Sequence, residues 1–220
     1  MLGWNATGTD RFVTEQAAES KGVLSGIVSG TRIATGHGWR PVQALCAGDL
    51  VVTFDAGVQP LAGVTRHQIW TGDMPCPPRF WLLEVPCEVL GHRAPLRIMP
   101  HQAVLIESDL AETLWGDPFA LLPGVALEDM EGVGRVPPEP DAEVVVLHFE
   151  ADQVVFAEHG PMFLCPSARG LLDDTPNPEK AVRYEVLPLS EAQVLVAAMG
   201  WDGARVQSET CLQDLGFARL

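Results

Sequence analysis

Serine, histidine and aspartate side chains that could form a hydrolytic triad occur in two groups. They are Ser29, His37 and Asp49, and Ser108, His101 and Asp109. A histidine can take the proton of a serine hydroxyl while a carboxylate orients the imidazole. Neither serine lies in a Gly-x-Ser-x-Gly sequence, the sharp turn that exposes a nucleophile in one large hydrolase class. A serine at a turn or a helix cap is the simpler interpretation of both groups.

Histidine and cysteine spacings argue against a metal or redox site. His92, His101, His148 and His159 form no HxH or HxxxH pattern. The five cysteines are Cys46, Cys76, Cys87, Cys165 and Cys211, and they include no CxxC pair. We therefore expect no metal and no cofactor, with cysteines that are reduced and buried. A Cys76–Cys87 disulfide remains the alternative.

The most informative stretch runs from Ser25 to Gly57. Apolar Ile27 and Val28 precede the Gly30-Thr31 pair, which predicts a strand and a tight turn. Residues 36–38, Gly-His-Gly, predict a hairpin connection because glycine readily adopts positive φ. Residues 47–49 predict a further turn before a buried strand at 50–54. If the chain catalyses a reaction, we expect the site here.

This stretch resembles the opening of a Hint (Hedgehog/intein) domain of the bacterial, alphaproteobacterial type. The matching residues keep the order and spacing of the family motif. They are Gly30-Thr31, Ile33, Thr35, Arg40-Pro41-Val42, Leu45, Gly48-Asp49, Val51, Thr53 and Gly57 to Pro60. Weaker similarity follows at 90–91, 95–97, 100–105 and 154–158. The resemblance covers about residues 23–170 and implies an all-β horseshoe of bent hairpins.

In active members of that family a Cys or Ser, four residues before Gly-Thr, attacks the preceding peptide carbonyl. This position is Gly26, which has no side chain to act as a nucleophile. The histidine that the family uses as an acid is replaced by Gln102, whose amide does not protonate a leaving group near neutral pH. A third histidine position holds Asp152. The C-terminal His-Asn pair has no counterpart, since Asn177 is followed by Pro178.

Short apolar runs between Gly, Pro and Asp predict an all-β domain with few helices. We expect an N-terminal arm at 1–22 with a short helix at 10–20, a Hint-like β domain at 23–170, and a linker with a helical tail at 171–220. The expected strands are 33–35, 50–54, 62–70, 80–85, 96–99, 104–106, 144–149 and 154–157. We also expect a short helix within 108–122, a mobile acidic loop at 131–142, and a buried helix opened by a capping box at Ser190 and closed by Gly200.

The charge and hydropathy of the chain limit its partners. The chain has 220 residues and a formal net charge of −15, which argues against nucleic acid and against an anionic membrane surface. No apolar run reaches the roughly 20 residues that span a bilayer. The N-terminus lacks a basic segment followed by an apolar one, so we expect a cytoplasmic protein without a secretory signal.

We therefore expect a catalytically inactive Hint-like protein that binds another protein as an accessory or assembly subunit. The apolar residues of the N-terminal arm and C-terminal tail would contact that partner. The alternative is an autoprocessing enzyme that uses Ser25, or Ser29, with His101. Ser25 is a poor substitute for residue 26, because a slip of one residue turns a strand side chain to the opposite face.

Overall fold

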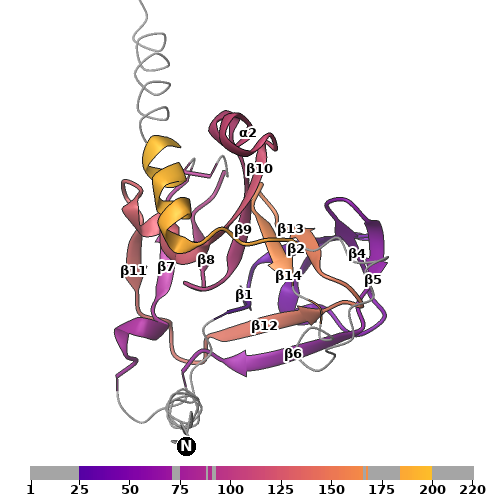
Figure 1. Cartoon of the computed structure of the whole chain (residues 1–220). Coiled ribbons are helices and arrows are strands. Elements are labelled where there is room, and N and C mark those ends of the chain that lie inside the picture. The colour runs from indigo at the N-terminus through magenta and orange to yellow at the C-terminus, as the bar shows by residue number, and fades with distance from the viewer. Residues whose placement is uncertain are drawn as a thin grey trace, which may run out of the picture.

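The computed structural model describes residues 25–70, 75–87, 89–90, 93–165, 167 and 184–199. The predicted all-β class is confirmed, since strands dominate this part of the chain (Figure 1). The strands are β1 (Ile27–Val28), β2 (Arg32–Thr35), β3 (Gly38–Pro41), β4 (Leu50–Thr53), β5 (Gly57–Pro60), β6 (Gly63–Gln68), β7 (Leu82–Val85), β8 (Leu96–Ile98), β9 (Ala103–Glu107), β10 (Phe119–Pro123), β11 (Gly134–Val136), β12 (Glu143–His148), β13 (Gln153–Phe156) and β14 (Met162–Cys165). The short helices are η1 (Val42–Ala44), η2 (Pro78–Phe80), α2 (Asp109–Trp115) and η3 (Gly124–Asp129).

In the described part of the chain, three antiparallel sheets bring together strands that lie far apart in the sequence. The largest sheet has the order β10-β9-β14-β13-β4-β2-β3, with β5 paired to β4. The second has the order β1-β12-β6, and the third has the order β11-β7-β8. The β1 strand therefore pairs with β12, more than a hundred residues later, through Ile27 opposite Val145. This long-range pairing places the start of the Hint-like stretch inside the domain (Figure 1).

One hydrophobic core connects the three sheets. Ile33 of β2, Leu83 of β7, Leu122 of β10 and Phe163 of β14 are all at most 1% exposed and belong to the same cluster. Full burial of such a side chain contributes about 1.5–3 kcal/mol to stability. The core thus fixes the strands on either side of the candidate site.

The first predicted hairpin is confirmed, and its turn is closed by a threonine. Thr35 Oγ1 donates to the carbonyl of Gly38 at 2.6 Å and accepts the N–H of His37 at 3.2 Å. Gly38 has φ of 94°, which favours glycine there. The expected strand at 50–54 is also present as β4, although Leu50 is 44% exposed and not buried.

The short helix expected within 108–122 is present as α2, but the expectation that the whole segment departs from the β pattern is wrong beyond Gly116. Gly116 adopts φ of 77° and ends α2 by donating its N–H to the carbonyl of Glu112. The Asp117 carboxylate then accepts the N–H of Phe119. Residues 119–123 form β10, which pairs with β9 along its whole length. The residues at 119–122, which we expected to lie outside the β pattern, are therefore a core strand, because a short apolar run does not by itself distinguish a strand from other structure.

The segment at 131–142 is not a free excursion. It contains β11, which pairs with β7 through Arg135 opposite Leu83. The Arg135 guanidinium also donates to the Glu128 carboxylate and to the carbonyl of Pro78. The prolines and glycines of this segment predict a loop, but tertiary pairing stabilises a strand of three residues within it.

A helix at residues 189–199 packs into the main core, as expected for an apolar helix. Ala192, Leu195 and Val196 are at most 1% exposed, whereas Val194 is 65% exposed. The capping box at Ser190 is wrong, because the helix begins one residue earlier and Pro188 accepts the first N–H groups. The predicted N-terminal arm and its helix, Gly200, and the end of the tail lie outside the described residues.

The four cysteines that the structure describes are less buried than expected, and Cys211 lies outside the described residues. Cys165 is buried, and burial raises the pKa of its thiol to about 12. Cys46 and Cys87 are exposed, and Cys76 is half-buried. Cys76 and Cys87 are free thiols, so the alternative disulfide is not formed. In the ranges given above, no helix is long and apolar enough to cross a membrane.

The Gly48-Asp49 turn gives a prediction about pH. Asp49 accepts the N–H of Cys46 at 2.8 Å and pairs with Arg40 at 3.0 Å. The Cys46 N–H, and then Arg40, hold the pKa of this carboxyl below its ordinary value of 3.8. A carboxyl with a lowered pKa stabilises the fold above its unfolded pKa and loses that contribution as pH falls through the folded value. We expect the Asp49→Asn protein to have a lower free energy of unfolding than the native protein at neutral pH. On acidification below about pH 4, its free energy of unfolding should fall less than that of the native protein.

Urea unfolding of Asp49→Asn across a pH series measures this effect. Asp141→Asn is the control, since Asp141 is exposed and makes no ion pair within the described residues. An acid dependence identical in the native protein and Asp49→Asn would contradict the assignment.

Candidate functional site

Gly26 and Gln102 join the chain before β1 to the turn that leads into β9. The Gly26 N–H donates to Gln102 Oε1 at 3.2 Å. Gln102 Nε2 donates to the carbonyls of Ala103 at 3.0 Å and Leu164 at 2.9 Å. Gln102 is 3% exposed, so these bonds lie inside the protein. One orientation of the amide satisfies all three backbone groups, because its oxygen only accepts and its nitrogen only donates.

These two residues occupy the positions that the family resemblance assigns to the nucleophile and the acid. The structure therefore brings together the two positions that the sequence separates by 76 residues. Glycine offers no attacking atom, and a carboxamide does not titrate in the range where general acids act. The contact between Gly26 and Gln102 is a backbone anchor made by groups that do not titrate.

The space around Gly26 does not accommodate a side chain. A Cβ at this residue would lie 2.6 Å from Val144 Cγ2 and 3.3 Å from both the Val145 carbonyl oxygen and Val146 Cγ2. Gly26 also has φ of 129°, a conformation that L side chains rarely adopt. A serine or cysteine at this position requires both a change of backbone conformation and displacement of Val144.

Ser25 and His101, the alternative catalytic pair, each precede one of the buried residues. Both are exposed, while Gly26 and Gln102 are buried. No hydrogen bond joins Ser25 to His101 in the described part of the chain. Ser29 is half-buried and follows β1. Neither residue lies on a strand, since Ser25 precedes β1 and His101 lies in the turn before β9, so the alternation of side chains along a strand does not apply to them.

Asp152, at the third family position, has a structural partner. Its Oδ1 accepts the N–H of Ser167 at 2.7 Å, after β14. This bond connects the beginning of β13 to the chain beyond β14. Asn177 and Pro178 lie outside the described residues.

The two triads suggested by residue types do not form. Asp49 pairs with Arg40 and not with His37, which is exposed. Ser108 is the residue before α2, and its side chain makes no capping bond. Within the ranges that the structure describes, no group of three or more His, Cys, Asp and Glu could hold a metal ion. His148 has a satisfied contact, 2.8 Å from its Nε2 to Thr65 Oγ1, and His92 lies outside the description.

Comparison with known families gives a match over more than half of the chain. The profile of the Hint domain (Hint_2) matches residues 26–162, from the Gly26 position to the start of β14. The chain belongs to the Hint domain family. Its sheets, with long-range pairing between β1 and β12, are thus those of a Hint fold. No curated protein matches the chain.

Two solved structures are similar to this Hint domain at low identity. One is a bacterial intein-like domain from Clostridium thermocellum, with 13% identity, 64% of this chain and 99% of that chain covered, and a TM-score of 0.41. The other is a variant of the AceL NrdHF class 3 split intein, with 12% identity, 65% and 98% coverage, and a TM-score of 0.38.

Sequence reasoning identified Gly26 and Gln102 but missed what they do for each other. The family resemblance indicated only a missing nucleophile and a missing acid. The hydrogen bonds of Gln102 and the position of Val144 depend on pairing between β1 and β12, which no local pattern encodes. One signal was available, since a glycine directly before an apolar strand often marks close approach of another part of the chain.

Proposed function

We propose that this Hint-domain protein is catalytically inactive and binds another protein, as an accessory or assembly subunit of a larger complex. The observation that carries the proposal is the buried contact between Gly26 and Gln102. We place the protein in the alphaproteobacterial type of the family and in the cytoplasm. Its acidic charge of −15 supports a protein partner over nucleic acid or an anionic membrane.

The Gly26–Gln102 contact supports inactivity more strongly than the loss of a single residue does. A lost nucleophile with a retained acid would leave part of the chemistry in place. Here a carboxamide satisfies three backbone groups at the acid position, and Val144 fills the space at the nucleophile position. Both positions are adapted to hold the fold together.

Exposed apolar side chains support a binding role. On α2, Leu114 is 53% and Trp115 is 45% exposed. On the helix at 189–199, Val194 is 65% exposed. Leu114 and Trp115 are consecutive at the end of α2, and exposed apolar side chains that lie together are typical of interaction sites. The proposed partner contacts come from the N-terminal arm at 1–22 and from the chain that follows the 189–199 helix.

Native purification of the tagged, full-length protein from its source cell tests the proposal. We expect a partner that co-elutes in size-exclusion chromatography at a fixed ratio, and at least about tenfold weaker association after deletion of the contacting segment. Deletion of 200–220 is more informative than deletion of 186–220, because the longer deletion removes Ala192, Leu195 and Val196 from the core. A native chain that elutes alone would contradict the proposal.

Intact-mass spectrometry of the same preparation distinguishes the autoprocessing alternative. That alternative requires a fragment cut at residue 25 or 26 that disappears in Ser25→Ala. We expect the mass of all 220 residues, unchanged by hydroxylamine or thiol. Hydroxylamine would release a chain held by an ester or thioester, so an unchanged mass excludes such an intermediate.

A further inference from the structure

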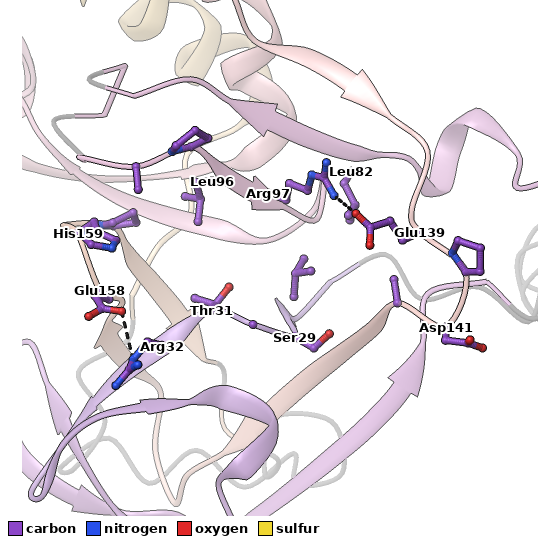
Figure 2. A pocket seen from close by; sticks show the side chains of 17 residues that line it. Ser29, Thr31, Arg32, Leu82, Leu96, Arg97, Glu139, Asp141, Glu158 and His159 are labelled. Carbon is purple, nitrogen blue, oxygen red and sulfur yellow. Dashed lines mark hydrogen bonds and ion pairs between the residues drawn. The ribbon is translucent and has the colours of Figure 1, made fainter.

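A cleft of about 580 Å³ lies between the chain that leaves β1 and strand β8. Residues 28–32 form one wall and Leu96 and Arg97 of β8 form the other (Figure 2). The β11–β12 connection closes one end and the β13–β14 turn closes the other. Gly26 and Gln102 do not line it, so it is distinct from the site described above. Its volume is in the range of natural ligand sites.

One wall of the cleft is the terminal strand β8, and the other begins at Val28 of the terminal strand β1 and continues through a turn into β2. Within the described chain, β1 is the terminal strand of β1-β12-β6, and β8 is the terminal strand of β11-β7-β8. A terminal strand offers backbone N–H and C=O groups that no neighbouring strand uses, and extended peptides bind to such edges. The buried side chains of Val28 and Leu82 give the cleft an apolar floor. This combination suits an extended chain with apolar side chains between polar ones.

Unusual backbone conformations occur at both ends of this cleft. Asp141 has φ of 66° and His159 has φ of 74°, and they are the two non-glycine residues of positive φ in the ranges the structure describes. Both line the cleft, one at each end (Figure 2). Positive φ is uncommon outside glycine, and such residues concentrate at ligand sites. The presence of both residues in one cleft distinguishes it from an incidental depression in the surface.

The charge of the cleft is acidic at the Asp141 end. Arg97 bonds two carboxylates, Glu139 at 2.8 Å and Glu84 at 3.0 Å. The Glu139 side chain is 75% exposed, and Asp141 has no ion pair among the described residues. Two carboxylates thus share the Arg97 guanidinium, and the carboxylate of Asp141 adds a further negative charge at this end of the cleft. At the other end Arg32 and Glu158 pair one to one at 3.2 Å.

We propose that this cleft binds an extended peptide segment of a partner protein, with a lysine or arginine seated at Glu139 and Asp141. The partner segment adds along the edge of β8, and its apolar side chains cover Val28 and Leu82. The cation of the segment neutralises the excess carboxylate charge that Arg97 leaves. This inference rests on the proposed binding function and names a surface for it.

Phage display of random peptides of roughly 12 residues, an extended length of about 40 Å, against the full-length protein tests the proposal. Selected peptides are then measured by fluorescence polarisation. We expect the selected peptides to be basic and apolar. They should bind the Glu139→Gln/Asp141→Asn protein at least about tenfold more weakly than the native protein, and their affinity for the native protein should fall as salt is added. Asparagine tolerates positive φ, so the variant removes charge without adding strain at residue 141.

The control is Glu131→Gln/Glu185→Gln, which makes the same change of charge at exposed residues outside the cleft. Selection of no basic peptide, or equal loss of binding in both double variants, would overturn the cleft assignment. A native complex that survives the cleft substitutions would also overturn it while leaving the proposed function in place. Absence of any native partner would instead count against the proposed function.

Discussion

Replacement of Gly26 by cysteine is expected to lower the free energy of unfolding by about 2–5 kcal/mol and to produce no self-cleavage. Positive φ at a residue with a side chain costs about 1–3 kcal/mol. The new Cβ would also lie 2.6 Å from Val144 Cγ2, and overpacking of this kind costs about 1–3 kcal/mol more. Urea unfolding measures the loss, and intact-mass spectrometry measures cleavage.

A double-mutant cycle with Val144 separates the two causes. Gly26→Ala places the same Cβ without a thiol, and Val144→Ala removes the methyl group that it meets. We expect Val144→Ala to destabilise the Gly26→Ala protein less than the native protein, because it relieves the overlap in the first case and leaves a cavity in the second. A Gly26→Cys protein of native stability would contradict the steric argument, whereas the proposal of inactivity would be refuted by self-cleavage of the native chain.

The sequence predicts the fold best where the local residue pattern and the tertiary pairing favour the same structure. The 35–38 hairpin has its glycine and its threonine in sequence, and its bonds are local. The run that becomes β10 was misassigned, because the bond network after Gly116 and the pairing to β9 are set by tertiary contacts. β11 was missed for the same reason, since its three residues are a strand only beside β7.

The candidate site shows a similar division. The resemblance to the Hint family indicated that a glycine, Gly26, stands at the position of the nucleophile and that Gln102 stands at the position of the acid. The hydrogen bonds from Gln102 to residues on β9 and β14 require coordinates, because the carbonyl of Leu164 is 62 residues away in the chain. The cleft was not predicted at all, since its walls come from segments that no motif connects. The chemistry that depends on side-chain identity could thus be predicted from the sequence, whereas the hydrogen bonds to backbone groups could not.

Substitution of Gln102 by leucine, which is similar in size, is expected to cost about 3–5 kcal/mol of stability. The change leaves the Gly26 N–H and the carbonyls of Ala103 and Leu164 without their partner inside the protein. Each unsatisfied buried group costs about 1–3 kcal/mol, and local relaxation recovers part of the sum. Urea unfolding gives the total, and amide hydrogen exchange at Gly26 reports the loss of its own bond.

Gln68→Leu is the matched control for this experiment, because Gln68 is an exposed strand residue and the same chemical change removes no buried amide. We expect that control to change stability by less than about 0.5 kcal/mol. Gln102→His distinguishes anchoring from chemistry, since an imidazole restores the family's acid but has too few ring nitrogens to reach all three backbone groups. If Gln102 anchors the fold, Gln102→His is destabilised and uncleaved. A stable Gln102→His protein that cuts before residue 26 would mean that the site retains its chemistry.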